Sequence, residues 1–142
     1  MFILRGDRII VGEVRDGACI DMLQAMNTGH CGMSTGHANS TTDALSRLET
    51  MVLLGGTEIP LRAVRRQIAS AIDIIIQLGR FRDRSRRVLE IAEVAGCEGD
   101  EIVLNPLFVF IEEGEYEGRV TGILRRTQNP LIRTGKLRAA GL

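Results

Sequence analysis

The 142-residue sequence contains no tryptophan, and aromatic side chains make up only 4% of it. Proteins that bind single-stranded nucleic acid usually stack the bases on aromatic rings, so no such stacking platform is expected here. Net charge is also missing, because 18 basic residues balance 18 acidic ones. A balanced chain creates no overall field that attracts polyanions. We therefore expect no nucleic-acid partner.

Long apolar runs and paired cysteines are missing as well. No run reaches the roughly 18 apolar residues that a membrane-spanning helix needs. The opening residues Met1 to Arg8 are too short, and become charged too soon, for a signal peptide. The three cysteines, Cys19, Cys31 and Cys97, are an odd and scattered set, which indicates reduced thiols and not a disulfide framework. We expect a cytoplasmic protein that does not insert into a membrane.

The phosphate-binding loop of nucleotide hydrolases, G-x-x-x-x-G-K-[ST], does not occur in the sequence. Residues 118–121 and 135–136 come nearest, but they lack the second glycine and the Lys-[ST] pair. That loop cradles phosphates with backbone N–H groups and a lysine. Tight nucleotide binding by this chain alone is therefore not expected.

The hydrophobic pattern present in the sequence predicts an α/β fold over residues 1–142. A continuous apolar run near the start predicts a strand buried on both faces, as in a parallel sheet. Two further helices are expected to begin at Ser40, whose hydroxyl can cap a helix, and at Pro60, which suits a first turn. The expected strands are 8–12, 33–38, 74–76, 86–94, 101–110 and 119–124, and the expected helices are 16–27, 40–55 and 60–72. A parallel sheet with helices thus precedes antiparallel strands, and a flexible tail follows from about residue 125.

Glu13 is the first candidate for chemistry, because it directly follows the apolar strand 8–12. Ligands of open parallel sheets bind outside the carboxyl ends of the strands. A carboxylate there can hold Mg²⁺ through water or orient the water that attacks a γ-phosphate. Many strands end in an acid, so a cap or a surface salt bridge is the alternative interpretation.

Several ordered runs around Glu13 resemble a known family, the type II/type IV secretion ATPases, and most closely their tight-adherence (Flp) pilus branch. The runs are Gly12-Glu13-Val14-Arg15, Asp21-Met22-Leu23-Gln24-Ala25-Met26-Asn27-Thr28-Gly29-His30 and Ser34-Thr35-Gly36-His37-Ala38-Asn39-Ser40. The resemblance continues through Asp43-Ala44-Leu45-Ser46-Arg47-Leu48-Glu49, Gln67-Ile68-Ala69-Ser70-Ala71-Ile72-Asp73 and Leu107-Phe108-Val109-Phe110. It therefore covers nearly the whole chain.

The resemblance implies a partial RecA-like P-loop NTPase domain, namely the C-terminal portion of the motor domain from the Walker B strand onward. Family members assemble as homo-hexamers, use ATP and Mg²⁺, and drive secretion or pilus assembly. Their implied partners are other ATPase subunits and the platform proteins of the inner membrane. The implied location is the cytoplasm, peripheral to the inner face of that membrane.

The resemblance also implies roles for individual residues. Glu13 matches the Walker B glutamate that polarises the attacking water, and Gly12 stands where many P-loop enzymes carry aspartate. His30 and His37 fall in the family's His box, where His37 would face the terminal phosphate. Gly12, Glu13 and His37 are thus the implied nucleotide-binding residues, and Mg²⁺ is implied only indirectly, through Glu13. The His box is one residue short after Gly32, which favours His37 over His30, since a one-residue change can reverse side-chain facing.

The histidines and the arginines also have other interpretations. A histidine in a glycine-rich loop is often structural, bonded to backbone carbonyls. Zinc binding by Cys19, His30, Cys31 and His37 fits no strong template, so no metal site is predicted. The arginines at positions 80, 82, 84, 86 and 87 are expected to form a solvated hairpin. The basic residues of the tail are expected to be a flexible, solubilising end; they are Arg125, Arg126, Arg133, Lys136 and Arg138.

The first functional hypothesis is that the chain is a C-terminal fragment of a hexameric secretion ATPase. Such a fragment would come from a truncated or split gene, or be a shortened piece of one. It would be inactive alone because the phosphate-binding loop is absent. The second is a non-catalytic module that docks onto full-length ATPase subunits. The third is an unrelated small Cys/His metal protein.

Overall fold

The computed structural model describes residues 8–56 and 58–142, which form two compact units. Of the described residues, unit 1 comprises 8–56, 58–72 and 97–102, and unit 2 comprises 73–96 and 103–142. The opening segment considered as a signal peptide lies, apart from Arg8, outside the described residues. The described elements mix helices with one parallel and one antiparallel sheet, so the predicted α/β fold class is confirmed.

Unit 1 contains a two-stranded parallel sheet of β1 (Arg8–Val11) and β2 (Cys31–Ser34). Val11 pairs with Ser34 at the carboxyl ends of the two strands. The predicted burial of the first strand on both faces is wrong, since the Ile10 side chain is 71% exposed. Within the described residues β1 pairs only with β2. The face that carries Ile10 and Met33 is exposed. The second strand also begins and ends earlier than predicted.

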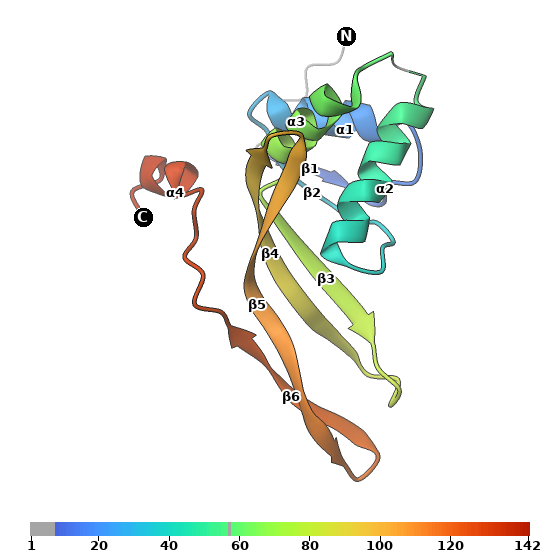
Figure 1. The fold of residues 1–142 in the computed structure, drawn as a ribbon, viewed down its shortest axis with the longest axis vertical. Helices are drawn as coiled ribbons and strands as arrows, with labels where there is room; N and C mark the ends of the chain where they lie inside the picture. Colours follow the sequence, from blue (N-terminus) through green and yellow to red (C-terminus); the bar gives the residue numbers. More distant parts are fainter. Residues whose placement is uncertain (1–7, 57) are drawn as a thin grey trace. The chain divides into compact units, whose positions relative to one another are not determined.

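Three helices accompany this sheet in unit 1 (Figure 1). They are α1 (Cys19–Asn27), α2 (Thr41–Leu54) and α3 (Leu61–Ala71). Ser40 caps α2 as predicted, since its Oγ accepts a hydrogen bond from the Asp43 N–H at 3.0 Å. Helix α1 starts three residues later than predicted, because the Asp16 carboxylate accepts the Ala18 N–H and forms a turn first.

The core of unit 1 lies where α1, α2 and α3 meet. Leu23, Val52, Val64 and Ile68 are fully buried there. The apolar residues that supply these positions recur with helical spacing in the sequence, so burying one face of each helix against the others drives the packing. At the surface of this unit, Arg65 of α3 bonds Glu49 of α2 at 2.9 Å.

Unit 2 is built on an antiparallel sheet in the order β3-β4-β5-β6. Its strands are β3 (Ile74–Arg80), β4 (Arg86–Glu98), β5 (Glu101–Tyr116) and β6 (Arg119–Arg126); the tip of the β4–β5 hairpin, residues 97–102, belongs to unit 1. All four strands were predicted, and all four extend further than their apolar runs. Figure 1 shows them as long, twisted ribbons.

The arginine-rich turn between β3 and β4 is only partly the solvated hairpin that was predicted. Arg82 forms ion pairs with Glu112 at 2.6 Å and Glu115 at 3.0 Å. The Arg87 guanidinium lies over the rings of Phe81 and Phe110, with 5.7 and 5.5 Å to the ring centroids. Such stacking stabilises a cation that charge patterning alone places in solvent.

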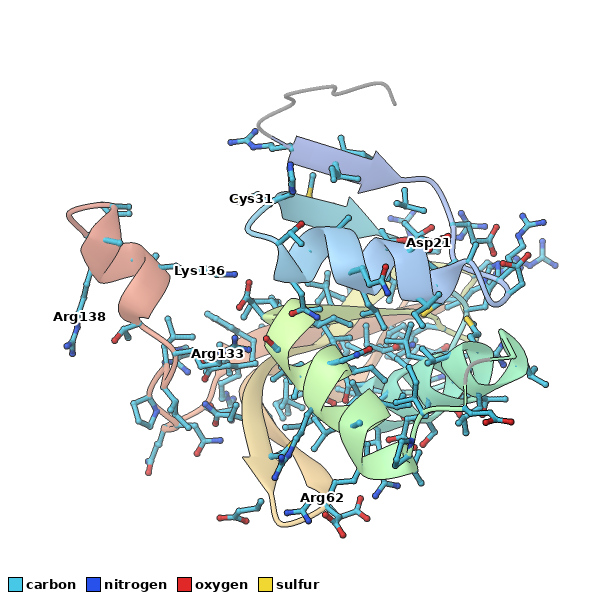
Figure 2. The ribbon with its side chains drawn as sticks, turned by 90° about the horizontal axis from the view of Figure 1, so that it is seen from above. Asp21, Cys31, Arg62, Arg133, Lys136 and Arg138 are labelled. Atoms are coloured by element: carbon cyan, nitrogen blue, oxygen red, sulfur yellow. The ribbon has the colours of Figure 1, made fainter. Side chains whose placement is uncertain are left out.

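The tail beyond β6 has defined partners within unit 2. Glu93 of β4 accepts the backbone N–H groups of Ile132 and Arg133, and it also accepts the Asn105 amide at 2.8 Å. The short helix α4 (Gly135–Ala139) follows. Figure 2 shows Lys136 and Arg138 leaving α4 in different directions, and Lys136 pairs with Asp73. Among the described residues, no helix is long and apolar enough to cross a membrane.

Candidate functional site

The candidate site lies in the two loops that follow β1 and β2. The carboxyl ends of parallel strands meet at one edge of a sheet, so the residues after Val11 and after Ser34 are neighbours. Two hydrogen bonds continue the pairing into the loops: the Thr35 hydroxyl donates to the Gly12 carbonyl, and the Val14 N–H donates to the Thr35 carbonyl at 2.9 Å. Glu13 is thereby held beside residues 36 and 37.

Glu13 and His37 meet at this edge. Oε1 of Glu13 lies 3.0 Å from Nε2 of His37. The Glu13 side chain is 22% exposed, whereas the His37 side chain is 88% exposed. The carboxylate is thus partly sheltered, while the imidazole can reach a ligand in solvent. These are the two residues that the sequence ranked highest, and the structure brings them together.

Arg15 is a third member of the site, and the sequence assigned no role to it. Its Nε donates to Glu13 Oε2 at 2.7 Å, and its Nη2 donates to the same oxygen. This hydrogen bond is the main reason that the pKa of Glu13 lies below its ordinary value, against a smaller opposing effect of burial. The only signal in the sequence was an opposite charge two residues from Glu13 in a segment without periodicity.

His30 does not join this group. It directly precedes β2, so it lies at the amino end of the strand, and Glu13 and His37 lie beyond the carboxyl ends. Its Nδ1 is 3.3 Å from the hydroxyl of Thr28, which closes α1. A catalytic role for His30 stays a prediction without a neighbouring group of the site to support it.

Gly12 contributes its backbone to the site. A Cβ added at this position would meet nothing within 4 Å, so a larger residue would fit sterically. Its carbonyl accepts the Thr35 hydroxyl and so helps to align the two loops. Contact of Gly12 with a nucleotide remains a prediction.

The zinc alternative finds no site in the part of the chain that the structure describes. No group of three or more His, Cys, Asp or Glu side chains is placed there to hold a metal ion. Cys19 is buried in α1, whereas Cys31 is exposed at the start of β2, where Figure 2 labels it. Burial raises the pKa of the Cys19 thiol to about 11.

A thiol-specific reagent is expected to label Cys31 and Cys97 quickly in the folded chain and to leave Cys19 unlabelled. Thiolate is the reactive form, and Cys19 is both shielded and hard to ionise. Mass spectrometry of labelled peptides measures this directly, and labelling in denaturant is the control in which Cys19 also reacts. Rapid labelling of Cys19 in the folded chain would contradict the described packing of α1.

The residues at this edge fit one end of a magnesium nucleotide. Glu13 offers carboxylate oxygens for a metal-bound or attacking water, and His37 and Arg15 offer N–H donors for phosphate oxygens. The set therefore suits a terminal phosphate and its water, but it provides no cradle for the remaining phosphates.

Known proteins with similar sequences belong to secretion and conjugal transfer systems. The family model described as "Type II/IV secretion system protein" matches residues 3–122. A putative conjugal transfer protein of Mycobacterium tuberculosis is 40% identical over 97 residues, which is 68% of this chain and 27% of that protein. The conjugal transfer protein TrbB of Rhizobium radiobacter is 43% identical over 94 residues, covering 66% of this chain and 28% of TrbB.

A solved structure shares the fold. The crystal structure of the VirB11 ATPase from the Brucella suis type IV secretion system, in complex with sulphate, superimposes with a TM-score of 0.60 at 24% identity. The match covers 63% of this chain and 28% of that one. The chain therefore spans about a quarter of the length of the relatives it matches.

Proposed function

Because this chain belongs to the type II/IV secretion system protein family, we propose that it supplies the water-activating part of a nucleotide-hydrolysing secretion motor. The observation that carries the proposal is the 3.0 Å approach of Glu13 and His37 at the carboxyl edge of β1 and β2. Ligands of open α/β sheets bind at such an edge. One matched structure is described as a VirB11 ATPase, and that description supports the choice of reaction.

In the proposed reaction, Glu13 accepts a hydrogen bond from the attacking water and orients it toward the terminal phosphate. His37 donates an N–H to an oxygen of that phosphate, so its contact is lost when the phosphate leaves. Bound Mg²⁺ would neutralise the charge that develops on the phosphates. Glu13 would hold the ion only through water.

The proposal places the chain in an assembly with other ATPase subunits, a hexamer by family resemblance, at the inner face of the membrane beside secretion or pilus platform proteins. ATP with Mg²⁺ is the proposed substrate. The phosphate-binding loop, absent from this sequence, would come from another polypeptide or another part of a longer chain. In this view residues 1–142 form the C-terminal portion of the motor domain.

The 142-residue chain alone is expected to release no phosphate from ATP above background. Without the loop and its lysine, most contacts to the phosphates are missing. A phosphate-release assay on the purified chain and on Glu13→Gln should give the same baseline. Turnover by the chain that disappears in Glu13→Gln would show that it is an active enzyme by itself.

A second candidate function is a non-catalytic module that docks onto full-length subunits. The observation in its favour is the open face of the β1–β2 sheet, where Ile10 and Met33 are exposed. Parallel sheets are normally covered on both faces, so this surface suits a protein partner. Co-purification with a full-length subunit that is indifferent both to nucleotide and to Glu13→Gln would favour this candidate.

A further inference from the structure

Both carboxylate oxygens of Glu13 are already engaged. Arg15 donates two hydrogen bonds to Oε2, while Nε2 of His37 lies 3.0 Å from Oε1. Each carboxylate oxygen can accept about two hydrogen bonds, and a water that Glu13 orients needs one of these positions. Oε2 has none left while Arg15 donates twice to it, so the described arrangement is a resting one for that oxygen.

The Arg15 contact is the one that can be exchanged. Arg15 lies two residues from Glu13 outside any helix or strand, and its side chain is 76% exposed. Exposed ion pairs of this kind contribute little to stability, because water screens them and long side chains lose entropy in forming them. A change of partner by Arg15 would leave the fold of unit 1 intact.

A phosphate group is a better partner for this guanidinium than a single carboxylate oxygen. The guanidinium fork binds two phosphate oxygens side by side, and a terminal phosphate carries more charge than a carboxylate. In the structure both guanidinium donors bind the same oxygen of Glu13. The guanidinium therefore does not have the two-oxygen geometry that it prefers.

We propose that Arg15 is a positioning residue that holds Glu13 in a resting ion pair and releases it when a phosphate group takes the guanidinium. Binding of the phosphate frees Oε2 of Glu13 for water, so the carboxylate becomes available only when a phosphate group is present. Departure of the phosphate returns Arg15 to Glu13 and closes the site again. This inference rests on the proposed function, since it concerns the regulation of the same carboxylate.

The test uses the 142-residue chain, carbon-13 NMR of the glutamate carboxyl groups and nitrogen-15 NMR of arginine Nε. Inorganic tripolyphosphate serves as the probe. In the unmodified chain, tripolyphosphate should shift the Arg15 Nε signal and raise the midpoint of the Glu13 titration. Arg15→Gln should show the raised midpoint from the start and no further response. Arg15→Lys should respond in part, because lysine keeps the charge but lacks the fork.

Arg84→Gln is the matched control, since Arg84 is an exposed arginine of unit 2 and should leave the Glu13 response unchanged. An unmoved Arg15 signal, or a Glu13 midpoint equal in the unmodified chain and Arg15→Gln, would overturn the proposal. Because the assay needs no hydrolysis, the resting ion pair of Arg15 and the proposed hydrolysis reaction can be refuted separately. A motor that hydrolyses ATP while Arg15 ignores phosphate refutes only the coupling, and a phosphate response without any hydrolysis refutes only the proposed reaction.

Discussion

Glu13→Gln is expected to slow ATP hydrolysis about 10²–10⁴-fold when the chain is combined with a family polypeptide that carries the phosphate-binding loop, because a positioned general base contributes that much. Glutamine keeps the shape of the side chain but cannot take the proton of the attacking water. The KM for ATP should change little, since Glu13 is proposed to act on water and not on the bulk of the nucleotide. Steady-state kinetics of phosphate release give both constants.

Two comparisons make the Glu13 experiment specific. Glu58→Gln alters an exposed acid ahead of α3 and should leave turnover unchanged. His37→Gln should lower turnover less than Glu13→Gln, because the glutamine amide can still donate a hydrogen bond to a phosphate oxygen. Equal turnover in Glu13→Gln and Glu58→Gln would remove Glu13 from the reaction.

Glu93→Gln is expected to destabilise the protein by about 3 kcal/mol, the lower end of the cost of breaking a buried charged network. The Glu93 side chain is 1% exposed and accepts hydrogen bonds from Ile132, Arg133 and Asn105. A glutamine amide would point an N–H at the backbone N–H groups that the carboxylate now satisfies. Urea unfolding measures the loss, and Glu113→Gln, an exposed acid of β5, should change it by less than about 0.5 kcal/mol.

The same substitution should alter how stability depends on pH. Burial raises the pKa of Glu93, but the hydrogen bonds from Ile132, Arg133 and Asn105 outweigh it and hold the pKa below the ordinary 4.5. Since the folded pKa is the lower one, this contribution to stability is present above pH 4.5 and is lost as the pH falls through the folded pKa. The unmodified chain should therefore lose more stability on acidification than Glu93→Gln, and parallel curves would contradict the assigned role.

The sequence predicted features that depend on neighbouring residues. The Ser40 cap, the helix after Pro60 and all four strands of unit 2 follow from local pattern and are present in the structure. The exposure of Ile10 did not follow, because a continuous apolar run does not show whether other elements cover both faces of its strand. Arg82 pairs with Glu115, and Glu93 binds Arg133 of the tail; these partners lie 33 and 40 residues away along the chain, a separation that no local pattern encodes.

The candidate site was predictable to a similar degree. The position of Glu13 after a strand pointed to the carboxyl edge of the sheet, and the resemblance supplied His37. Parallel pairing of Val11 with Ser34 then explains why these side chains meet although they are 24 residues apart. The two hydrogen bonds of Arg15 to one oxygen of Glu13 could not be read from the sequence, because they depend on the loop conformation after Gly12.

The most direct test of the central claim is a phosphate-release assay on the unmodified chain, on a family polypeptide that carries the phosphate-binding loop but ends before the Walker B strand, and on a mixture of the two. We expect background rates for each polypeptide alone and ATP hydrolysis by the mixture, which Glu13→Gln slows about 10²–10⁴-fold. Hydrolysis by the mixture that persists undiminished with Glu13→Gln, or a stable complex of the two that never hydrolyses ATP, would contradict it.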